Sequence, residues 1–228
     1  MKILHVVHGA TFGGIESLLL GISREINSEK LTFDYIVHSE KYLPFQEQLI
    51  EKKGEIFQLP PFGKNPLKYI NKLLIILRKN KYDIIHIHTG IHSGLIGAIA
   101  FFSGVKVRIC HAHNSSTENK KHLQTIFIWK ILISIFCNEL IACTSRSAKF
   151  WFLSKQFTIF QNSISIEKFI IAKNLKNSSK NNRINDAPST LTIGHAGRFT
   201  PVKNHIFIIN LARSLIAKNF LDFQILLA

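Results

Sequence analysis

The sequence has few cysteines: 3 in 228 residues, namely Cys110, Cys137 and Cys143. None of them stands in a CxxC pair and all three lie in apolar runs, which argues against a disulfide framework and against a zinc knuckle. A chain with so few cysteines suits a reducing compartment. We therefore expect a cytoplasmic protein.

The chain also lacks a long uninterrupted apolar stretch. The longest one, from Ile126 to Cys137, contains Lys130 and has about 12 residues, whereas ~20 are needed to cross a bilayer. The amino terminus, MKILHVVHGA, carries His5 and His8 inside its apolar run and so lacks the core of a signal peptide. We expect a soluble or membrane-peripheral protein, not an integral one.

Acidic residues are scarce, since 14 Asp and Glu accompany 29 Lys and Arg, and the formal net charge is +15. The excess lies in residues 56–228, because residues 1–55 hold slightly more acidic than basic side chains. Such a bias indicates an anionic partner, which can be nucleic acid, a membrane surface or a phosphorylated ligand. No nucleic-acid-binding motif accompanies the charge, so we expect no nucleic-acid partner.

What the chain does contain is a repeated alternation of short apolar runs with amphipathic stretches. Continuous apolar runs are typical of parallel strands buried on both faces, and amphipathic stretches predict helices. The repetition predicts an α/β fold with a Rossmann-like doubly wound parallel sheet and right-handed crossovers. The expected strands are 2–8, 33–38, 55–59, 83–88, 106–111, 140–143 and 158–160. The expected helices are 15–26, 44–53, 66–80, 91–102, 121–136 and 145–153, the one at 66–80 with Leu67, Ile70, Leu74 and Leu77 on its apolar face.

The composition then changes. Residues 172–188 are rich in Lys, Asn and Ser and have no aromatic residue, which is typical of a linker. A strand at 191–196, a helix at 203–218 and a strand at 223–228 follow, and these are too few elements to bury a core. We predict an N-terminal domain at 1–170, a linker at 171–190 and the incomplete beginning of a second Rossmann-like domain at 191–228.

A glycine-rich turn follows the first predicted strand. In GATFGGIES, Gly9, Gly13 and Gly14 stand just before a helix. Glycines let a backbone approach a ligand, and the free N–H groups of a helix N-terminus attract an anion. The spacing is not GxGxxG, so no NAD site is predicted. A turn without chemical consequence is the alternative.

Two predicted strands end in paired histidines, His86 with His88 and His111 with His113. Alternation places both members of a pair on one face of the strand, and ligands of open α/β sheets bind beyond the carboxyl ends of the strands. Ligand contact, a structural role and a metal site are all compatible with the pattern. Since the only carboxylate at ligand spacing, Asp83, begins its strand, we expect no metal.

Two further stretches are basic. In GHAGRFTPVKNH (194–205), Arg198 follows the end of a predicted strand and Lys203 opens the next predicted helix, where a guanidinium and an ammonium suit a diphosphate. Between 64 and 81 every charged residue is basic, and on a helix Lys68 and Lys72 share a face, with Lys64 just ahead of it. Such a face could bind anionic lipid head groups. In both stretches, solvated surface cations are the alternative.

Together these motifs resemble the retaining glycosyltransferases of the GT-B, family-4 type, especially those of bacterial capsular polysaccharide and exopolysaccharide synthesis. The segments that carry the resemblance follow in order along nearly the whole chain: GGIE (13–16), DIIHIH (83–88), HAHN (111–114), ACTSRSA (142–148), QNSISIEKF (161–169) and GRFTPVKNH (197–205). Two features depart from the family pattern. Residues 162–165 read NSIS where the family has NGI or NGV with Asp, and the E-x7-E motif of the second domain is absent.

The resemblance implies an acceptor-binding first domain and a second domain that binds a nucleotide-sugar donor, without cofactor or metal. It assigns the donor diphosphate to Gly13, Gly14, Arg198 and Lys203, and the sugar contact to His111 with His113 as second candidate. It assigns the acceptor side to Glu16, His88 and Asn114. It further implies a lipid-linked glycan acceptor and a peripheral place on the inner face of the cell membrane. Because the donor pocket is missing, we expect this chain alone to be inactive; a non-catalytic remnant or a basic binding module of the same fold is the alternative.

Overall fold

The computed structural model describes residues 1–228 apart from 8–12, 27–29, 39–53, 117–120, 155, 164–165, 167–169, 171–189 and 198, and it describes only the backbone of 121–124 and 202. The chain forms two compact units, Met1–Ile166 and Glu167–Ala228. The helix expected at 44–53, and all but the last residue of the linker expected at 171–190, lie outside the described residues.

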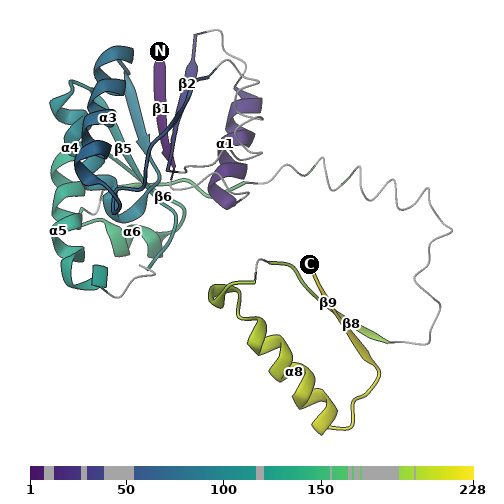
Figure 1. Ribbon diagram of the computed structural model, residues 1–228. Coiled ribbons are helices and arrows are strands. Elements are labelled where there is room, and N and C mark those ends of the chain that lie inside the picture. Colours follow the sequence, from purple (N-terminus) through teal and green to yellow (C-terminus); the bar gives the residue numbers. More distant parts are fainter. Residues whose placement is uncertain are drawn as a thin grey trace. The chain divides into compact units, whose positions relative to one another are not determined.

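A seven-stranded sheet, parallel throughout, forms the centre of the first unit (Figure 1). Its strand order is β3-β2-β1-β4-β5-β6-β7, so that the chain winds outward in both directions from the boundary between β1 and β4. This confirms the doubly wound α/β fold. The strands are β1 (Lys2–Val7), β2 (Thr32–Val37), β3 (Ile56–Gln58), β4 (Ile84–Ile87), β5 (Val107–Ala112), β6 (Glu139–Ala142) and β7 (Thr158–Ile159).

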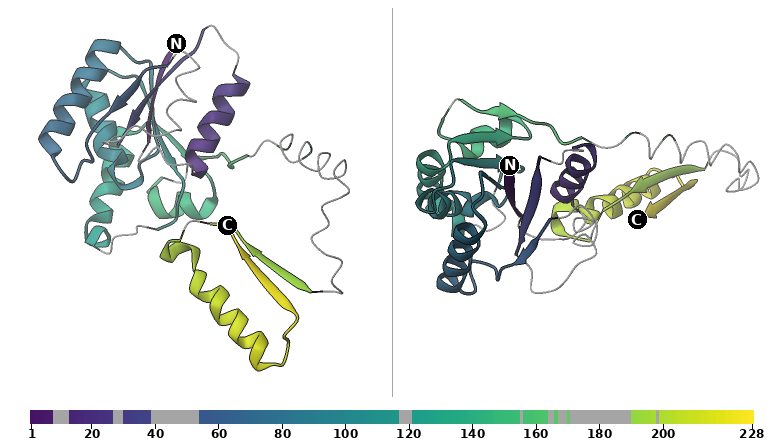
Figure 2. Two further views of the ribbon diagram at one scale, coloured as in Figure 1. Left: turned by 45° about the vertical axis from the view of Figure 1, so that its right-hand side comes forward. Right: turned by 90° about the horizontal axis from the view of Figure 1, so that it is seen from above.

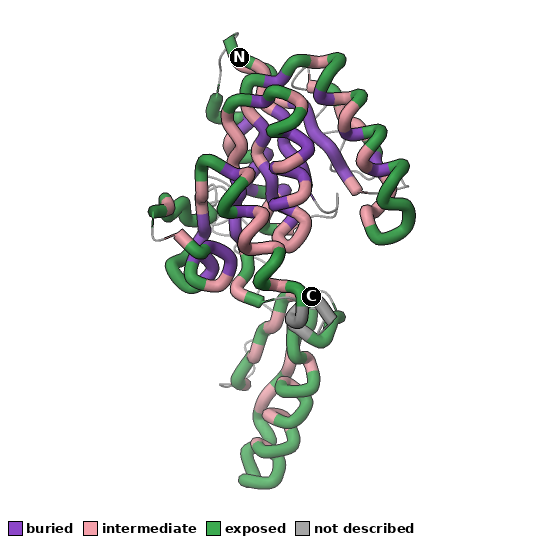
Figure 3. Tube along the Cα trace, turned by 90° about the vertical axis from the view of Figure 1, so that its left-hand side faces the viewer, coloured by how far each residue is buried: buried purple, intermediate pink, exposed green. Residues whose placement is uncertain are grey.

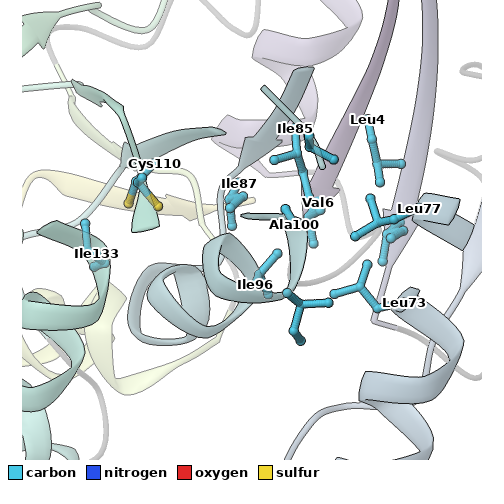
Figure 4. Packing of buried hydrophobic residues seen from close by; sticks show 14 of the residues in the cluster. Leu4, Val6, Leu73, Leu77, Ile85, Ile87, Ile96, Ala100, Cys110 and Ile133 are labelled. Atoms are coloured by element: carbon cyan, nitrogen blue, oxygen red, sulfur yellow. The ribbon is translucent and has the colours of Figure 1, made fainter. Parts of the chain in front are cut away.

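Four helices pack against one face of this sheet, α3 (Pro66–Asn80), α4 (Ser93–Phe102), α5 (Lys121–Phe136) and α6 (Ser145–Trp151). Figure 4 shows apolar side chains of α3, α4 and α5 pointing toward side chains of β1, β4 and β5. Every second strand residue faces these helices, because side chains alternate along a strand. The labelled core residues are Leu4, Val6, Leu73, Leu77, Ile85, Ile87, Ile96, Ala100, Cys110 and Ile133.

Helix α1 (Gly14–Glu25) packs on the opposite face, as two further views show (Figure 2). Leu19 and Leu20 of this helix lie in a second apolar cluster with Val7, Tyr35 and Val37 of β1 and β2. Val6 and Val7, which are neighbours in sequence, therefore belong to different clusters on opposite faces of the sheet. The sheet is buried on both faces at β1 and β2, as its continuous apolar runs predicted.

Helix α3 begins and ends where the sequence predicted, and its buried face agrees with the expected one except at Leu67. Asn65 caps the helix by accepting a 3.0 Å hydrogen bond from the Lys68 backbone N–H, and Pro66 occupies the first turn. The buried side chains are Tyr69, Leu73 and Leu77, whereas Leu67 is 80% exposed. Of the expected apolar face, Leu77 is buried and Ile70 and Leu74 are partly buried against the core, so only Leu67, in the first turn, was assigned wrongly.

Helices α4 and α5 pack closely because glycines of α4 face α5. A Cβ atom at Gly94 would lie 2.6 Å from the Leu132 Cβ atom and 2.7 Å from the Ile133 backbone nitrogen. Such distances leave no room for a methyl group. A 3₁₀ turn, η1 (Gly90–His92), precedes α4, so this helix begins two residues later than expected.

The second unit contains two parallel strands, β8 (Leu191–His195) and β9 (Phe223–Leu227), with Ile193 opposite Ile225. Between them lie a 3₁₀ turn, η2 (Pro201–Lys203), and helix α8 (His205–Ala217). We had expected Lys203 to open the helix. Instead it ends the 3₁₀ turn, because Asn204 interrupts the turn with a left-handed backbone (φ 51°). No residue of α8, all of which is described, is buried (Figure 3). Strand, helix and parallel strand make this a βαβ unit, the repeating element of Rossmann-like folds.

Among the described residues, no helix combines the length and the apolar character needed to cross a membrane.

Candidate functional site

Five histidines from three neighbouring strands gather on the α1 side of the sheet. His5 lies in β1, His86 and His88 lie in or just after β4, and His111 and His113 lie in or just after β5. Their side chains share a face because each alternates with a residue of the opposite core, such as Val6, Ile87 or Ala112. Ring centroids of neighbouring histidines are 4.0–5.6 Å apart. We call these five residues the histidine cluster.

Nitrogen atoms of the cluster pair across the strands. The Nδ1 atom of His88 is 2.8 Å from the Nε2 atom of His113, and its Nε2 atom is 3.4 Å from the Nδ1 atom of His5. The Nε2 atom of His86 is 3.2 Å from the Nδ1 atom of His111. Each of these pairs can share one proton, which makes the cluster a connected polar network.

The network continues across the carboxyl edge of the sheet to β6, β7 and α1. The Sγ atom of Cys143, directly after β6, is 3.1 Å from the Nδ1 atom of His113. The Cys143 thiol donates to the Oδ1 atom of Asn162, which follows β7, over 3.5 Å. The Nδ2 atom of Asn162 in turn lies 3.7 Å from where a Cβ atom of Gly14 would stand. The start of α1 thus comes to the same edge as the ends of β5, β6 and β7.

The direction of the thiol hydrogen bond assigns protons along this chain of contacts. A neutral imidazole has one N–H donor and one acceptor. If the Cys143 proton points to Asn162, the Nδ1 atom of His113 carries the proton that faces Sγ, and its Nε2 atom accepts. His88 then donates from Nδ1 and accepts at Nε2 from His5. One set of tautomers satisfies every contact.

Burial keeps the cluster neutral. Desolvation lowers the pKa of His5 to about 3, of His111 to about 4 and of His113 to about 3, with neighbouring imidazoles adding to the effect for His5 and His113. The same causes hold the pKa values of His86 and His88 well below the ordinary value. Near pH 7 the rings therefore offer lone pairs and N–H groups, and no positive charge.

Two sets of three rings could also hold a metal ion, His5 with His86 and His88, and His88 with His111 and His113. Within each set the candidate ligand nitrogens lie within 4.8 Å of one another.

The structure brings several predicted site residues together in the first unit. The network includes the predicted residues His88, His111 and His113, and Gly14 lies next to it. Gly13 caps α1 without a side chain, so it leaves first-turn N–H groups for a ligand. Glu16 is buried in the first turn of the same helix.

Asn114 has a structural partner at this edge. Its backbone oxygen and its Oδ1 atom accept hydrogen bonds of 2.9 Å and 3.0 Å from the indole Nε1 atom of Trp151 in α6. Asn114 itself is exposed, and so it stands at the rim of the edge.

The other two predicted diphosphate ligands do not belong to the described part of the first unit. Arg198 lies outside the described residues. Lys203 is in the second unit, where it is exposed and its side chain packs 3.3 Å from where a Cβ atom of Gly197 would stand.

Sequence reasoning missed three members of the network, His5, Cys143 and Asn162. His5 could have been found from its position in the alternation of β1, because it stands between two apolar residues as His86 does in β4. Cys143 ends the predicted strand at 140–143 and Asn162 follows the one at 158–160 by two residues, which signals a place at the carboxyl edge.

Comparison with known proteins gives the site a family. The sequence pattern of Glycosyltransferase Family 4 matches residues 12–155. The chain is 29% identical over 237 residues to the protein EpsF of Bacillus subtilis, covering 100% of this chain and 61% of EpsF. It is 23% identical over 235 residues to the UDP-Gal:alpha-D-GlcNAc-diphosphoundecaprenol alpha-1,3-galactosyltransferase of Escherichia coli, covering 97% and 59%.

Among solved structures, HepE of Anabaena in complex with UDP-glucose superposes with a TM-score of 0.67 at 21% identity, over 100% of this chain and 60% of HepE. This likeness confirms the fold. The chain spans about 60% of the length of the curated relatives it matches. Since the family pattern covers more than half of the 228 residues, from the start of α1 past the histidine cluster to the end of α6, the chain belongs to Glycosyltransferase Family 4.

Proposed function

We propose that this chain forms the acceptor side of a glycosyltransferase that moves a sugar from a nucleotide-sugar donor to a lipid-linked glycan in bacterial surface polysaccharide synthesis. The observation that carries the proposal is the network from Gly14 to His113 at the carboxyl edge of the sheet. Ligands of open α/β sheets bind at this edge. This chain belongs to Family 4, and it has neutral imidazoles at that edge.

His113 is the ring we assign to the reacting sugar. His111 is 1% exposed, whereas His113 is half-buried at the end of β5 and is the more accessible of the two. The Nδ1 atom of His113 contacts a thiol, which is a weak hydrogen-bonding group, so a sugar hydroxyl can replace it at low cost. His111 then acts as a positioning residue, which reverses the order that we expected from the sequence.

The donor diphosphate would bind at the first turn of α1. Glycines at positions 13 and 14 allow its oxygens to approach the backbone, where free N–H groups and the helix dipole favour negative charge. Arg198 and Lys203 would add fixed cations aimed at the departing diphosphate, and such charges stabilise a leaving group without a metal. In this scheme the nucleotide sugar is a substrate and no cofactor is needed.

The relatives indicate the substrate classes. HepE was solved with UDP-glucose, and the Escherichia coli relative is named for UDP-Gal and a diphosphoundecaprenol acceptor. We accordingly propose a UDP-sugar donor and a polyprenyl-diphosphate-linked acceptor, with Glu16, His88 and Asn114 on the acceptor side. Retention of configuration at the sugar carbon is part of the proposal, as is a peripheral place on the inner face of the cell membrane.

The test joins this chain to the part of EpsF that lies beyond the match, with intact EpsF as the positive control. UDP-sugars and a polyprenyl-linked acceptor are supplied, and radiolabel in the lipid phase is measured. We expect transfer with retained configuration. His113→Ala, Arg198→Ala and Lys203→Ala should each lower kcat/KM roughly 100-fold, about 3 kcal/mol of transition-state stabilisation. A folded hybrid that transfers no sugar while EpsF is active would overturn the proposal.

A further inference from the structure

Three imidazoles at the carboxyl edge of the sheet converge closely enough to share one ion. The candidate ligand nitrogens of His88, His111 and His113 lie within 4.8 Å of one another. The shortest separation is the 2.8 Å between the Nδ1 atom of His88 and the Nε2 atom of His113. A proton now joins these two atoms, and a metal ion could take its place.

The size of the required adjustment is small. Tetrahedral zinc sites have Zn–N bonds of about 2.0–2.1 Å, which places ligand nitrogens roughly 3.3 Å apart. The pair of His88 and His113 would have to separate by about half an ångström. The candidate ligand nitrogen of His111 lies at most 4.8 Å from those of His88 and His113, and it would have to move closer to both. His88 and His113 directly follow strands β4 and β5, and rotation of these two side chains can supply the separation.

The donor set selects the class of ion. Neutral imidazoles suit zinc, copper, nickel and cobalt, whereas Mg²⁺ and Ca²⁺ prefer oxygen ligands. The Cys143 thiol lies 3.1 Å from the Nδ1 atom of His113 and 4.0 Å from the Nε2 atom of His111, so the surroundings also suit a softer metal. No carboxylate belongs to either three-ring set among the described residues.

Access favours this set over the other. The two sets share His88, and each has two buried rings and one half-buried ring. The half-buried ring of the first set, His86, lies within β4. His113 is half-buried at the end of its strand, and it gives the second set a route for an ion to enter.

The geometry points to a binding site for one divalent ion of the zinc class on His88, His111 and His113. This departs from our expectation that the chain holds no metal, and it goes beyond the proposed transfer reaction. It does not depend on that reaction, because the site is defined by ligand geometry alone.

The experiment is equilibrium dialysis of the full chain, purified without a histidine tag and stripped with a chelator, against ZnCl₂. We expect one equivalent of Zn²⁺ to bind, with no displacement by a large excess of Mg²⁺. His113→Ala should weaken binding tenfold or more. The matched control is the double variant His195→Ala/His205→Ala, which removes two imidazoles from the second unit and should bind Zn²⁺ as the parent does.

A second measurement separates loss of a ligand from loss of the fold. Circular dichroism checks that His113→Gln remains folded, and the visible spectrum of added Co²⁺ reports the coordination. The parent should show the intense bands of a four-coordinate site, and the folded variant should lose them. Zinc binding by His113→Ala equal to that of the parent, loss of binding in the control variant, or no retained zinc in the parent would overturn the inference.

Discussion

Asp34 and Tyr82, 48 residues apart in sequence, are joined by a 2.6 Å hydrogen bond that the Tyr82 hydroxyl donates to the Asp34 Oδ2 atom. The same carboxylate pairs with the Lys2 ammonium at 2.9 Å and accepts a 2.9 Å hydrogen bond from the Glu55 backbone N–H at its Oδ1 atom. Asp34 is 1% exposed. One buried carboxylate in β2 therefore ties together the chain at β1, just before β3 and just before β4.

We expect Asp34→Ala to destabilise the first unit by about 3–5 kcal/mol, because it leaves the buried Tyr82 hydroxyl, the Glu55 backbone N–H and the Lys2 ammonium without their partner. Tyr82→Phe removes one hydrogen bond and keeps the ring, so it should cost only about 1–2 kcal/mol. Urea unfolding followed by circular dichroism measures both. Equal losses for the two variants would show that the carboxylate has no role beyond Tyr82.

Two helical glycines should respond to alanine in opposite directions. A methyl group at Gly94 would meet Leu132 and the backbone of α5 at under 3 Å, so Gly94→Ala should destabilise the fold by about 1–3 kcal/mol. Gly21, in α1, has no atom within 4 Å of the added methyl group. Gly21→Ala should therefore stabilise the protein by roughly 0.5–1 kcal/mol, through helix propensity alone. Thermal unfolding of both variants is the measurement. Stabilisation by Gly94→Ala would contradict the packing of α4 on α5, and destabilisation by Gly21→Ala would contradict the open space at Gly21.

The sequence predicted the bounds of helices and strands better than it predicted the contacts between side chains of different strands. The bounds of α3 are clear because Asn65 and Pro66 mark its start, and the strands are clear because they are short apolar runs between polar segments. The start of α4 was misplaced because Gly90 adopts a positive φ of 65°, which no sequence periodicity reveals. The histidine pairs were found from alternation within one strand. Their links to His5, Cys143 and Asn162 depend on strand order and register, which appear only when the sheet is assembled.

The histidine cluster should make the protein sensitive to acid. Below pH 6.5 the unfolded chain binds protons at its histidines, whereas the folded rings with pKa values of about 3–4 do not. Because the unfolded state binds more protons, the free energy of unfolding falls as the pH falls from 6.5 toward 4, by up to about 1.4 kcal/mol per pH unit for each ring. This contribution is complete above pH 6.5.

Urea unfolding of the parent and of His113→Gln between pH 7.5 and 4.5, with a chelator present, measures this effect. The difference in unfolding free energy between the two proteins should change with pH in favour of the variant as acid is added. Two parallel curves over this range would mean that His113 titrates alike in the folded and unfolded states.

Helix α3 should attach the protein to anionic membranes. Lys64, Lys68 and Lys72 are exposed at and along this helix, and Leu67 and Ile75 stand among them at 80% and 56% exposure. Lipid head groups attract cations near the surface by about 1 kcal/mol each, and exposed apolar side chains can enter the interface. Lys130 of α5 adds less to such a basic surface, since it is half-buried and its ammonium lies 5.3 Å over the Phe150 ring.

Vesicle co-sedimentation decides whether this basic face of α3 binds lipid or is only solvated. We expect binding to vesicles that contain phosphatidylglycerol, little binding to phosphatidylcholine alone, and release near ~0.5 M salt, where screening is strong. Lys64→Glu/Lys68→Glu/Lys72→Glu should abolish binding.

The control Arg24→Glu/Lys149→Glu/Lys218→Glu makes the same change in net charge at exposed positions of α1, α6 and the end of α8, and it should bind nearly as the parent does. If both triple variants lose binding equally, net charge alone attracts the protein and α3 is not the contact. If the parent ignores anionic vesicles, the face is only solvated.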